Sequence, residues 1–426
     1  MNASLRSLDS LSRRQFAERV AKATLGVTLL PQVLKGQAAA DPKSLPGFGK
    51  AKRVIWLQMI GGMSHIDTLD PKTGATKGPS DPISTKAGYQ LGGYLPTLAK
   101  NHSEKLAIIR SMTSKTGVHA SGQYLMRTGY EQRGTIKHPV LGAWAQELLG
   151  KSSASLPSTV CVGRAPESGN GFFSAAFSPL PIHDPEAGLQ YAEFGAPKEI
   201  INKRLALLNE VDAGFRAKFH DTNLKAYTDF YDDTLKLLST EDLNAFRLTE
   251  EDSAAREIYG MNKFGQGCML ARRLVERGVR FVEVAQGGWD MHNDIADGME
   301  DNGSLLDQGL SALLSDLQSR GLLETTLVVL CSEFGRSPKI NSRNGRDHHP
   351  KVFSTLLAGG PAKGGTIYGA SDAEGNAPAD KQVTIQDFHS TVGHALGLDV
   401  NQIVMSPSNR PFTVGDKGTV IQEVLA

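Results

Sequence analysis

The sequence predicts an α/β fold in which a mostly parallel central sheet is flanked by helices. Two apolar runs, residues 279–285 and 327–331, have the length and composition of strands buried on both faces of a sheet. Between them, residues 304–320 carry leucines at the spacing of an amphipathic helix. A strand, a helix and a strand in this order form a right-handed crossover, which joins parallel strands of one sheet.

Length and composition limit the classes of protein that need to be considered. The chain has 426 residues, which suits one large α/β domain with insertions or two domains. Its formal net charge of +1 provides no extended positive surface for nucleic acid. The three cysteines, Cys161, Cys268 and Cys331, are too few and too scattered for a disulfide framework or a thiolate zinc site. We expect Cys331, inside an apolar run, to be a core residue.

The first 40 residues have the pattern of an export signal. Arg13 and Arg14 form a twin-arginine pair, a mildly apolar run follows at 20–34, and small residues suited to cleavage follow at 38–40. The apolar run is too short and too interrupted for a permanent membrane span. We therefore expect residues 1–40 to engage the twin-arginine export machinery, residues 41–426 to form the mature domain, and the protein to be periplasmic or secreted. The alternative is a cytosolic amphipathic helix that contains two arginines.

The first strand of the mature domain is predicted at residues 53–60, where a central-strand pattern ends at Gly61-Gly62. His65 and Asp67 follow directly. Open α/β sheets bind their ligands beyond the carboxyl ends of the strands, so both residues are candidate metal ligands. A surface turn is the alternative interpretation.

A second strand, residues 105–111, leads to a helix at 120–127. His119 and Ser121 lie at the start of this helix, where free backbone amides can hold an anionic group. Both are candidate catalytic residues, and Ser121 is a candidate nucleophile. Helix capping is the structural alternative for a hydroxyl at this place.

Two segments in the middle of the chain interrupt the alternation of strands and helices. Residues 164–184 are rich in Gly, Pro, Ser and Phe, and form an excursion long enough to shape a substrate pocket. Residues 198–256 are charged and carry apolar residues at helical spacing. We expect the second segment to be a helical insertion or cap that packs against the main domain.

Two groups of potential metal ligands follow the two strands of the crossover. The group after 279–285 consists of Asp290, His292 and Asp294, which would share one side of an extended segment. The group after 327–331 consists of Glu333, Asp347, His348 and His349. Because the carboxyl ends of parallel strands meet at one edge of a sheet, we expect the two groups to form one site. Arg336, close to Glu333, is predicted to clamp an anionic substrate with its forked guanidinium.

The C-terminal part continues the pattern. A strand is predicted at 352–358, a turn or hairpin at 363–369, and a helix from 384 to 398 with Asp387 as its cap. His389 and His394 lie too far apart around this helix to share a ligand face, so we expect both to be structural or surface residues.

Four motifs, taken in order, resemble the exported bacterial family known as domain of unknown function 1501. They are Gly-Gly-x-Ser-His-x-Asp at 61–67, Gly-Gly-Trp-Asp-x-His at 287–292, Ser-Glu-Phe-Gly-Arg-Ser-Pro at 332–338 and Gly-x-Asp-His at 345–348. This resemblance spans the chain from about residue 53 to the C-terminus. The strand at 326–329 and the residues after it are also similar to alkaline phosphatases and sulfatases, which implies an alkaline-phosphatase-like fold.

The same resemblance suggests roles for single residues. Glu333-Phe334 stands where an Asp-His metal pair of that superfamily is expected, and Asp347 with His348 could replace the pair. His119 stands at the position of the nucleophile, counted back from Thr128-Gly129. His349 falls near the third metal histidine of alkaline phosphatases.

These observations predict a metal-dependent hydrolase that acts on a phosphate or sulfate ester of a small molecule or glycan. One or two divalent cations would be held by residues from the set His65, Asp67, Asp290, His292, Glu333, Asp347, His348 and His349. Oxygen and nitrogen ligands favour zinc or manganese, with calcium as a third option. The cation would polarise the ester and lower the pKa of a bound water or of a hydroxyl such as that of Ser121.

Two other classes of function are compatible with the same motifs to different degrees. An exported protein could keep the fold without catalysis and bind an anionic glycan or a partner protein in the same cleft. A redox or hydride-transfer enzyme is disfavoured because no glycine-rich dinucleotide-binding loop follows any predicted strand.

Overall fold

The structure is a computed structural model that describes residues 42–190, 192, 195–218 and 222–426. The predicted signal peptide, residues 1–40, lies outside the described residues. The chain divides into two compact units, and a short 3-10 helix, η1 (Pro42–Ser44), is the described part of the first. The second unit, Leu45–Ala426, carries the sheet and every candidate site residue.

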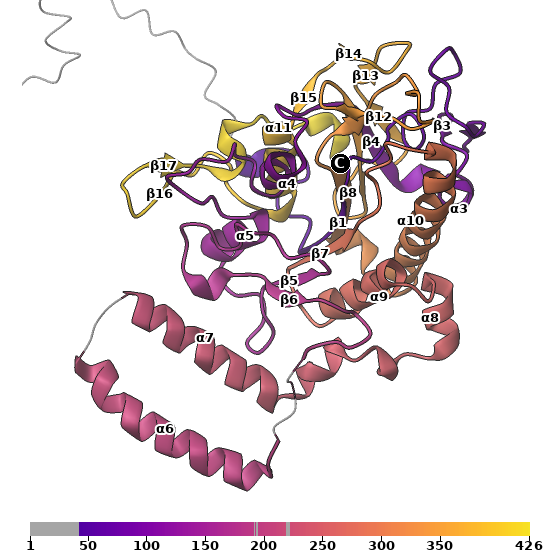
Figure 1. Cartoon of the computed structure of the whole chain (residues 1–426). Helices are drawn as coiled ribbons and strands as arrows, with labels where there is room; N and C mark the ends of the chain where they lie inside the picture. The colour runs from indigo at the N-terminus through magenta and orange to yellow at the C-terminus, as the bar shows by residue number, and fades with distance from the viewer. Residues whose placement is uncertain (1–41, 191, 193–194, 219–221) are drawn as a thin grey trace, which may run out of the picture. The chain divides into compact units, whose positions relative to one another are not determined.

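A nine-stranded sheet forms the centre of this unit, in the order β12-β4-β11-β8-β1-β7-β5-β6, with β15 paired to β4 (Figure 1). Its strands are β1 (Arg53–Met59), β4 (Leu106–Thr113), β5 (Thr159–Val162), β6 (Leu180–Ile182), β7 (Phe281–Gln286), β8 (Thr326–Ser332), β11 (Phe353–Ala358), β12 (Thr366–Tyr368) and β15 (Val383–Thr384). Strand β11 is antiparallel to both of its neighbours, β4 and β8, and the other pairs in this sheet are parallel. The predicted mostly parallel α/β fold is therefore confirmed.

Short two-stranded ladders shape the loops around this sheet. They are β2 (Ile83–Ser84) with β3 (Gln90–Leu91), β9 (Gly335–Arg336) with β10 (His348–His349), β13 (Ala370–Ser371) with β14 (Pro378–Asp380), and β16 (Val404–Met405) with β17 (Pro411–Phe412). The ladder of β9 and β10 pairs Arg336 with His348 and Gly335 with His349. It folds the long loop after β8 back on itself, so that His348 returns to the end of that strand.

Helices cover both faces of the sheet (Figure 1). One face is covered by α3 (Pro96–Asn101), α8 (Ser253–Tyr259), α9 (Lys263–Glu276) and α10 (Ile295–Ser319), and the other by α4 (His119–Thr128), α5 (Leu141–Leu149) and α11 (Ile385–Leu396). Two separate hydrophobic clusters correspond to these two faces.

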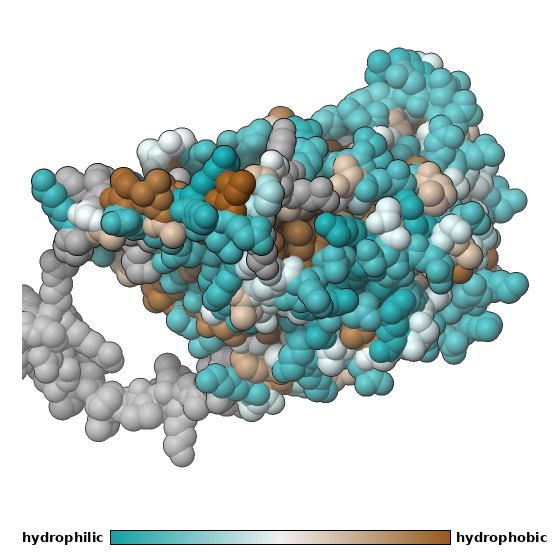
Figure 2. All heavy atoms as spheres, turned by 90° about the horizontal axis from the view of Figure 1, so that it is seen from below, coloured by the Kyte–Doolittle hydropathy of each residue, from teal (hydrophilic) through white to brown (hydrophobic). Residues whose placement is uncertain are grey.

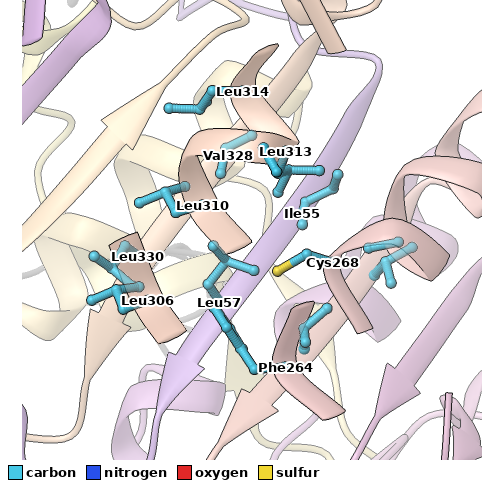
Figure 3. Packing of buried hydrophobic residues seen from close by; sticks show 14 of the residues in the cluster. Ile55, Leu57, Phe264, Cys268, Leu306, Leu310, Leu313, Leu314, Val328 and Leu330 are labelled. Carbon is cyan, nitrogen blue, oxygen red and sulfur yellow. The ribbon is translucent and has the colours of Figure 1, made fainter. Parts of the chain in front are cut away.

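Alternating side chains of β1 divide between the two clusters because successive residues of a strand point to opposite faces. Ile55 and Leu57 pack against α9 and α10, where Phe264, Cys268 and Leu310 lie close to them (Figure 3). Val54 and Trp56 belong to the opposite cluster. Cys331 is fully buried in that second cluster, as predicted. Burial of each large apolar side chain stabilises the fold by about 1.5–3 kcal/mol.

The segment expected to be helical, residues 198–256, contains α6 (Lys198–Lys218), α7 (Thr222–Ser239) and two 3-10 turns, η4 (Glu241–Phe246) and η5 (Leu248–Glu250). Leu207 and Val211 on α6 are 63% and 68% exposed.

The face shown in Figure 2 is mostly hydrophilic, with separate hydrophobic patches. Within the described residues, no helix combines the length and apolar character needed to cross a membrane.

Two predictions about local structure were wrong, and a third was right only in part. Helix α10 begins at Ile295 and not at residue 304, since Ile295 and Met299 are buried on the same helix and extend its apolar face toward the N-terminus. Asp294 is the N-cap of that helix, with a φ of 38°, so the segment is not extended there and Asp294 does not converge with Asp290 and His292. The segment predicted as a turn or hairpin at 363–369 contains a turn at residues 364–365, but no hairpin follows, because β12 pairs in parallel with β4 at the end of the main row of strands.

Both histidines of α11 are structural, as predicted. His389 is buried and its Nε2 lies 2.6 Å from the carbonyl oxygen of Met126, and Nε2 of His394 lies 2.9 Å from that of Pro46. Asp387 does not cap α11 alone, because Thr384 is the N-cap and the two side chains form a capping box.

Candidate metal centre

The candidate residues gather at one edge of the sheet, beyond the carboxyl ends of β1, β4, β7 and β8. Two glycines permit close contact between the loops. Gly61, after β1, has a φ of 122°, and a Cβ there would collide with the backbone of Trp289 and Asp290. On α4, a Cβ at Gly122 would come within 3.1 Å of the Cβ of Glu333. The loop after β1 therefore packs directly against the loop after β7. In the same way, α4 packs directly against the end of β8.

Asp290, after β7, is the centre of a group that we call the ligand cluster, which consists of Asp290, His119, His292 and His348. One carboxylate oxygen of Asp290 lies 3.1 Å from Nε2 of His348 and 3.2 Å from Nε2 of His292. Its other oxygen lies 3.3 Å from Nε2 of His119. The Nε2 atoms of His292 and His348 are 3.0 Å apart. Three imidazoles, from the start of α4, the loop after β7 and strand β10, thus direct the same ring nitrogen toward one carboxylate.

The other ring nitrogen of each histidine is held by an oxygen outside the cluster. The Nδ1–H of His119 donates to Glu333 (2.8 Å), that of His292 to Asp347 (2.9 Å) and that of His348 to the carbonyl oxygen of Gly117 (2.7 Å). A carbonyl and ionised carboxylates only accept hydrogen bonds, so the proton of each ring resides on Nδ1. Each Nε2 then presents a lone pair to the centre of the cluster.

This arrangement fits a divalent cation. Nε2 of His119, Nε2 of His348 and a carboxylate oxygen of Asp290 form a group that could hold a metal ion, and Nε2 of His292 lies beside Asp290 and His348. Nε2 of His119 has no hydrogen-bond partner. Ligands bound to zinc at about 2.0–2.1 Å in a tetrahedron lie about 3.3 Å from one another, close to the distances of 3.0–3.3 Å found between these atoms. The coordinating atoms of His119, Asp290 and His348 all lie within 4.8 Å of one another. Anchoring of Nδ1 by an outer oxygen is the usual support of a metal-binding histidine.

Glu333 supports the cluster from behind. Its carboxylate is fully buried and accepts from the backbone N–H of Gly61 (2.9 Å) and from the hydroxyl of Ser332 (3.2 Å), in addition to His119. We expected Glu333 to be a metal ligand, but its hydrogen bonds make it the residue that orients His119. Asp347 has the same relation to His292 and also accepts from Asn341 (3.1 Å).

Arg336 does not have the role that we expected. Its guanidinium is fully buried and donates to the carbonyl oxygens of Gly62 (3.0 Å), Arg346 (2.9 Å) and Gly61, and to Asp290. A guanidinium committed to these acceptors cannot also clamp a substrate. It instead fixes the carboxylate of Asp290 through an ion pair.

The electrostatics of the cluster follow from these contacts. Burial raises the pKa of Asp290, but the hydrogen bond and the positive charge of the Arg336 guanidinium oppose this effect, and the pKa lies well below its usual value. The hydrogen bond with Glu333, more than any other contact, raises the pKa of His119, although partial burial opposes it. The charge of Asp290 is therefore maintained across the physiological pH range.

His65, Asp67 and His349 lie outside the ligand cluster. Together with Arg346 they form what we call the buried set. Asp67 and Arg346 make an ion pair at 2.9 Å in which neither side chain is exposed. Nε2 of His65 lies 2.9 Å from the carbonyl oxygen of Gly375, and Nε2 of His349 lies 2.8 Å from that of Asn376. Burial lowers the pKa of His65 to about 4. The geometry makes these residues supports of the loop near residue 375, so their prediction as metal ligands is corrected.

Ser121 is not part of the cluster. Residues two positions apart on a helix are separated by about 200° around its axis, and His119 already faces Asp290 and Glu333. In the part of the chain that the structure describes, the Ser121 hydroxyl has no hydrogen-bond partner. The sequence suggested His119 as a catalytic residue, whereas the geometry places it in the group that could hold a metal ion. The signal was present, because His119 follows a strand that ends at the same edge as the others.

The fold and the site define a class of protein. It is an α/β protein with a candidate metal centre at the carboxyl edge of its sheet. The chain belongs to the family described as "Protein of unknown function (DUF1501)", whose model matches residues 51–425. The resemblance drawn from the four motifs is thereby confirmed at the level of the family. No curated protein matches the chain.

Several solved structures are similar to this chain. A sulfatase from Pseudoalteromonas sp. has 14% identity and a TM-score of 0.44, over 89% of this chain and 73% of that one. A protein in the alkaline phosphatase superfamily from Vibrio parahaemolyticus has 11% identity and a TM-score of 0.43, over 91% and 75%. The soluble domain of lipooligosaccharide phosphoethanolamine transferase A from Neisseria meningitidis has 11% identity and a TM-score of 0.37, over 82% and 88%. At identities this low, the chemistry of the site has to be inferred from the residues of this chain.

Proposed function

We propose that this protein is an exported, metal-dependent hydrolase of phosphate or sulfate esters. The observation that carries the proposal is the convergence of three imidazole Nε2 atoms on Asp290, each with its Nδ1 anchored by an outer oxygen. A cation between them would stabilise a set of acceptors that face one another in this way. The export signal read in residues 1–40 and the motif resemblance to alkaline phosphatases and sulfatases support the cellular location and the reaction class.

His119, His292, His348 and Asp290 would hold the cation, and Glu333, Asp347 and Arg336 would orient them. A donor set with three nitrogens and one carboxylate favours zinc, suits manganese less well and disfavours calcium, which takes oxygen ligands. When bound, such a cation polarises an ester oxygen and lowers the pKa of a bound water to about 7.

Water is the nucleophile that best fits the surroundings of the cluster. Among the described residues, no hydroxyl side chain is hydrogen-bonded to the carboxylate of Asp290 or to a ring nitrogen of the three histidines. The cluster is also open to solvent, since the side chain of Asp290 is 49% exposed and those of the three histidines are 26–29% exposed. We therefore assign no covalent role to Ser121.

Metal analysis together with a turnover assay tests the proposal. The exported protein should contain zinc and hydrolyse 4-nitrophenyl phosphate or 4-nitrophenyl sulfate. Asp290→Ala and the double variant His119→Ala, His348→Ala should lose both the metal and the turnover. His183→Ala, which changes an exposed histidine outside the cluster, is the matched control and should retain both. Absence of bound metal in the unaltered protein after incubation with zinc would exclude the proposal.

A non-catalytic binding protein is the second candidate. Two observations favour a binding protein. Among the described residues, no hydroxyl is hydrogen-bonded to the cluster, and the Arg336 cation lies beside Asp290. Metal binding without turnover of either aryl ester would select this candidate. Turnover that disappears in Asp290→Ala would reject it.

A further inference from the structure

A groove leads away from the ligand cluster along helix α4. Its inner part, with a volume of about 210 Å³, is lined by His119, Gln123 and Arg127 of α4 and by the loop after β5 from Arg164 to Ser168. An outer hollow of about 380 Å³ is lined by residues 132–137. Both parts share Tyr124, Gln132, Glu167 and Ser168, so they form one continuous depression, which we call the anion groove. Because His119 belongs to both the cluster and the groove, a molecule with one end at the cluster could extend into it.

Three cations in the anion groove lack a carboxylate partner. Arg133, Lys137 and Arg164 are exposed, and none of them belongs to an ion pair found among the described residues, although the charge of Arg133 opposes the rise that burial causes in the pKa of the Asp416 carboxyl. The fourth cation, Arg127, is different because it is buried and paired with Glu283. Glu167 is the one carboxylate among the described residues that line the groove. The surface of the groove therefore carries a local excess of positive charge, whereas the chain as a whole is nearly neutral, at +1.

The positions of the cations favour an extended ligand over a small one. A small ester would be held at the cluster alone, where Arg336 is already committed to Asp290. Arg164 lines the inner part, and Arg133 and Lys137 line the outer part, so positive charge continues beyond the cluster. Tyr124 lies between the two parts and could contact the apolar face of a sugar ring, as aromatic side chains do in many binding sites.

We propose that the anion groove binds an anionic oligosaccharide that places its reacting ester at the ligand cluster and a second anionic group at Arg133, Lys137 and Arg164. The reaction at the cluster rests on the proposed function, but binding in the groove does not require turnover. The second group is a sulfate, a phosphate or a carboxylate, since each accepts charge-assisted hydrogen bonds from guanidinium and ammonium groups. In this proposal, the loop after β5 recognises the part of the ligand beyond the reacting ester. The sequence suggested the same loop as part of a substrate pocket.

Calorimetric titration of the zinc-loaded full chain with a heparin-derived hexasaccharide tests the inference. A dextran hexasaccharide of similar length but without charge is the reference ligand. The triple variant Arg133→Ser, Lys137→Ser, Arg164→Ser should weaken binding of the charged hexasaccharide by about tenfold, because exposed ion pairs contribute modestly and add up. The matched control changes two arginines and one lysine outside the groove, Lys100→Ser, Arg204→Ser and Arg277→Ser, and should bind like the unaltered protein. Equal loss of affinity in both triple variants, or no loss in the first, would overturn the inference.

Two further measurements distinguish binding in the groove from the reaction at the ligand cluster. Asp290→Ala should still bind the charged hexasaccharide within a few-fold, since the groove cations remain, even though its aryl ester turnover is lost. The affinity for the heparin-derived hexasaccharide should also be compared with that for a phosphorylated mannan oligosaccharide. This comparison distinguishes sulfate from phosphate as the second group. If the charged hexasaccharide binds and no aryl ester is hydrolysed, the proposed function fails and the groove assignment stands. If aryl esters are hydrolysed and neither charged oligosaccharide binds, the groove assignment fails alone.

Discussion

The ligand cluster and the buried set contain the same types of residue at the same edge of the sheet, yet their hydrogen bonds differ. In the cluster, Nδ1 of each histidine is anchored and Nε2 faces other acceptors. In the buried set, Nε2 of His65 and of His349 is itself occupied by a backbone carbonyl. Asp290 is half-exposed and shared by three histidines, whereas Asp67 is buried and paired with Arg346.

The comparison shows that residue type and position at a strand end do not distinguish a metal ligand from a structural residue. The distinction depends on which nitrogen of an imidazole is already used. It also depends on the exposure of the nearby carboxylate, since Asp67 and Asp290 each pair with a buried arginine but only Asp290 remains open to solvent.

Removal of the carboxylate from the buried set should affect stability and not metal content. Asp67→Ala leaves the Arg346 guanidinium buried without its partner, which should lower the free energy of unfolding by about 3–5 kcal/mol. Denaturant unfolding of the variant measures this loss, and metal analysis of its folded fraction should match the unaltered protein. A loss of metal with little change in stability would place Asp67 in the metal site.

Removal of the metal should destabilise only a protein with an intact ligand cluster. At a free zinc concentration about 100 times the dissociation constant, bound metal contributes about 2.7 kcal/mol to folding. Addition of a chelator should therefore lower the melting temperature of the unaltered protein and leave that of Asp290→Ala unchanged. A chelator effect of equal size in both proteins would mean that Asp290 is not a ligand.

Loss of the residue that orients His119 should weaken metal binding without abolishing it. Glu333→Gln keeps the shape of the side chain but removes the charged acceptor of the His119 Nδ1–H, and outer-sphere changes of this kind reduce metal affinity by about 10–100-fold. Competition with a fluorescent zinc chelator measures the effect. Gln123→Ala, which removes a weaker contact with the same carboxylate at 3.4 Å, is the control.

The buried set should also respond to acid. Because burial lowers the pKa of His65 to about 4 in the folded protein, the neutral ring contributes stability that is present above the unfolded pKa of about 6.5 and is lost as the pH falls toward 4. His65→Gln, which can still donate to the carbonyl of Gly375, should show an acid loss of stability smaller by roughly 1–2 kcal/mol. Unfolding curves at pH 7 and pH 4.5 measure it, and identical losses in both proteins would contradict the assignment.

The sequence predicted which residues form the site better than it predicted the role of each residue. The crossover from 279–285 to 326–332 correctly indicated that Asp290, His292 and His348 would meet, because parallel strands end at the same edge. It could not indicate that Glu333 and Asp347 hold histidines, since this depends on contacts between loops far apart in the chain. The buried position of Arg336 was equally hidden, because its acceptors are backbone carbonyls of residues 61, 62 and 346.

By itself, the sequence determined the α/β architecture, the main strands and the edge of the sheet where chemistry is expected. Hydrophobic periodicity carries this information locally, since apolar runs and amphipathic stripes specify buried strands and helices wherever they occur. Only the tertiary structure decided which histidines direct Nε2 toward Asp290 and where a groove leads from them. An imidazole has two nitrogens, and the partner of each is set by a backbone or side-chain oxygen such as those of Gly117, Gly375 and Glu333, which only the folded chain brings within reach.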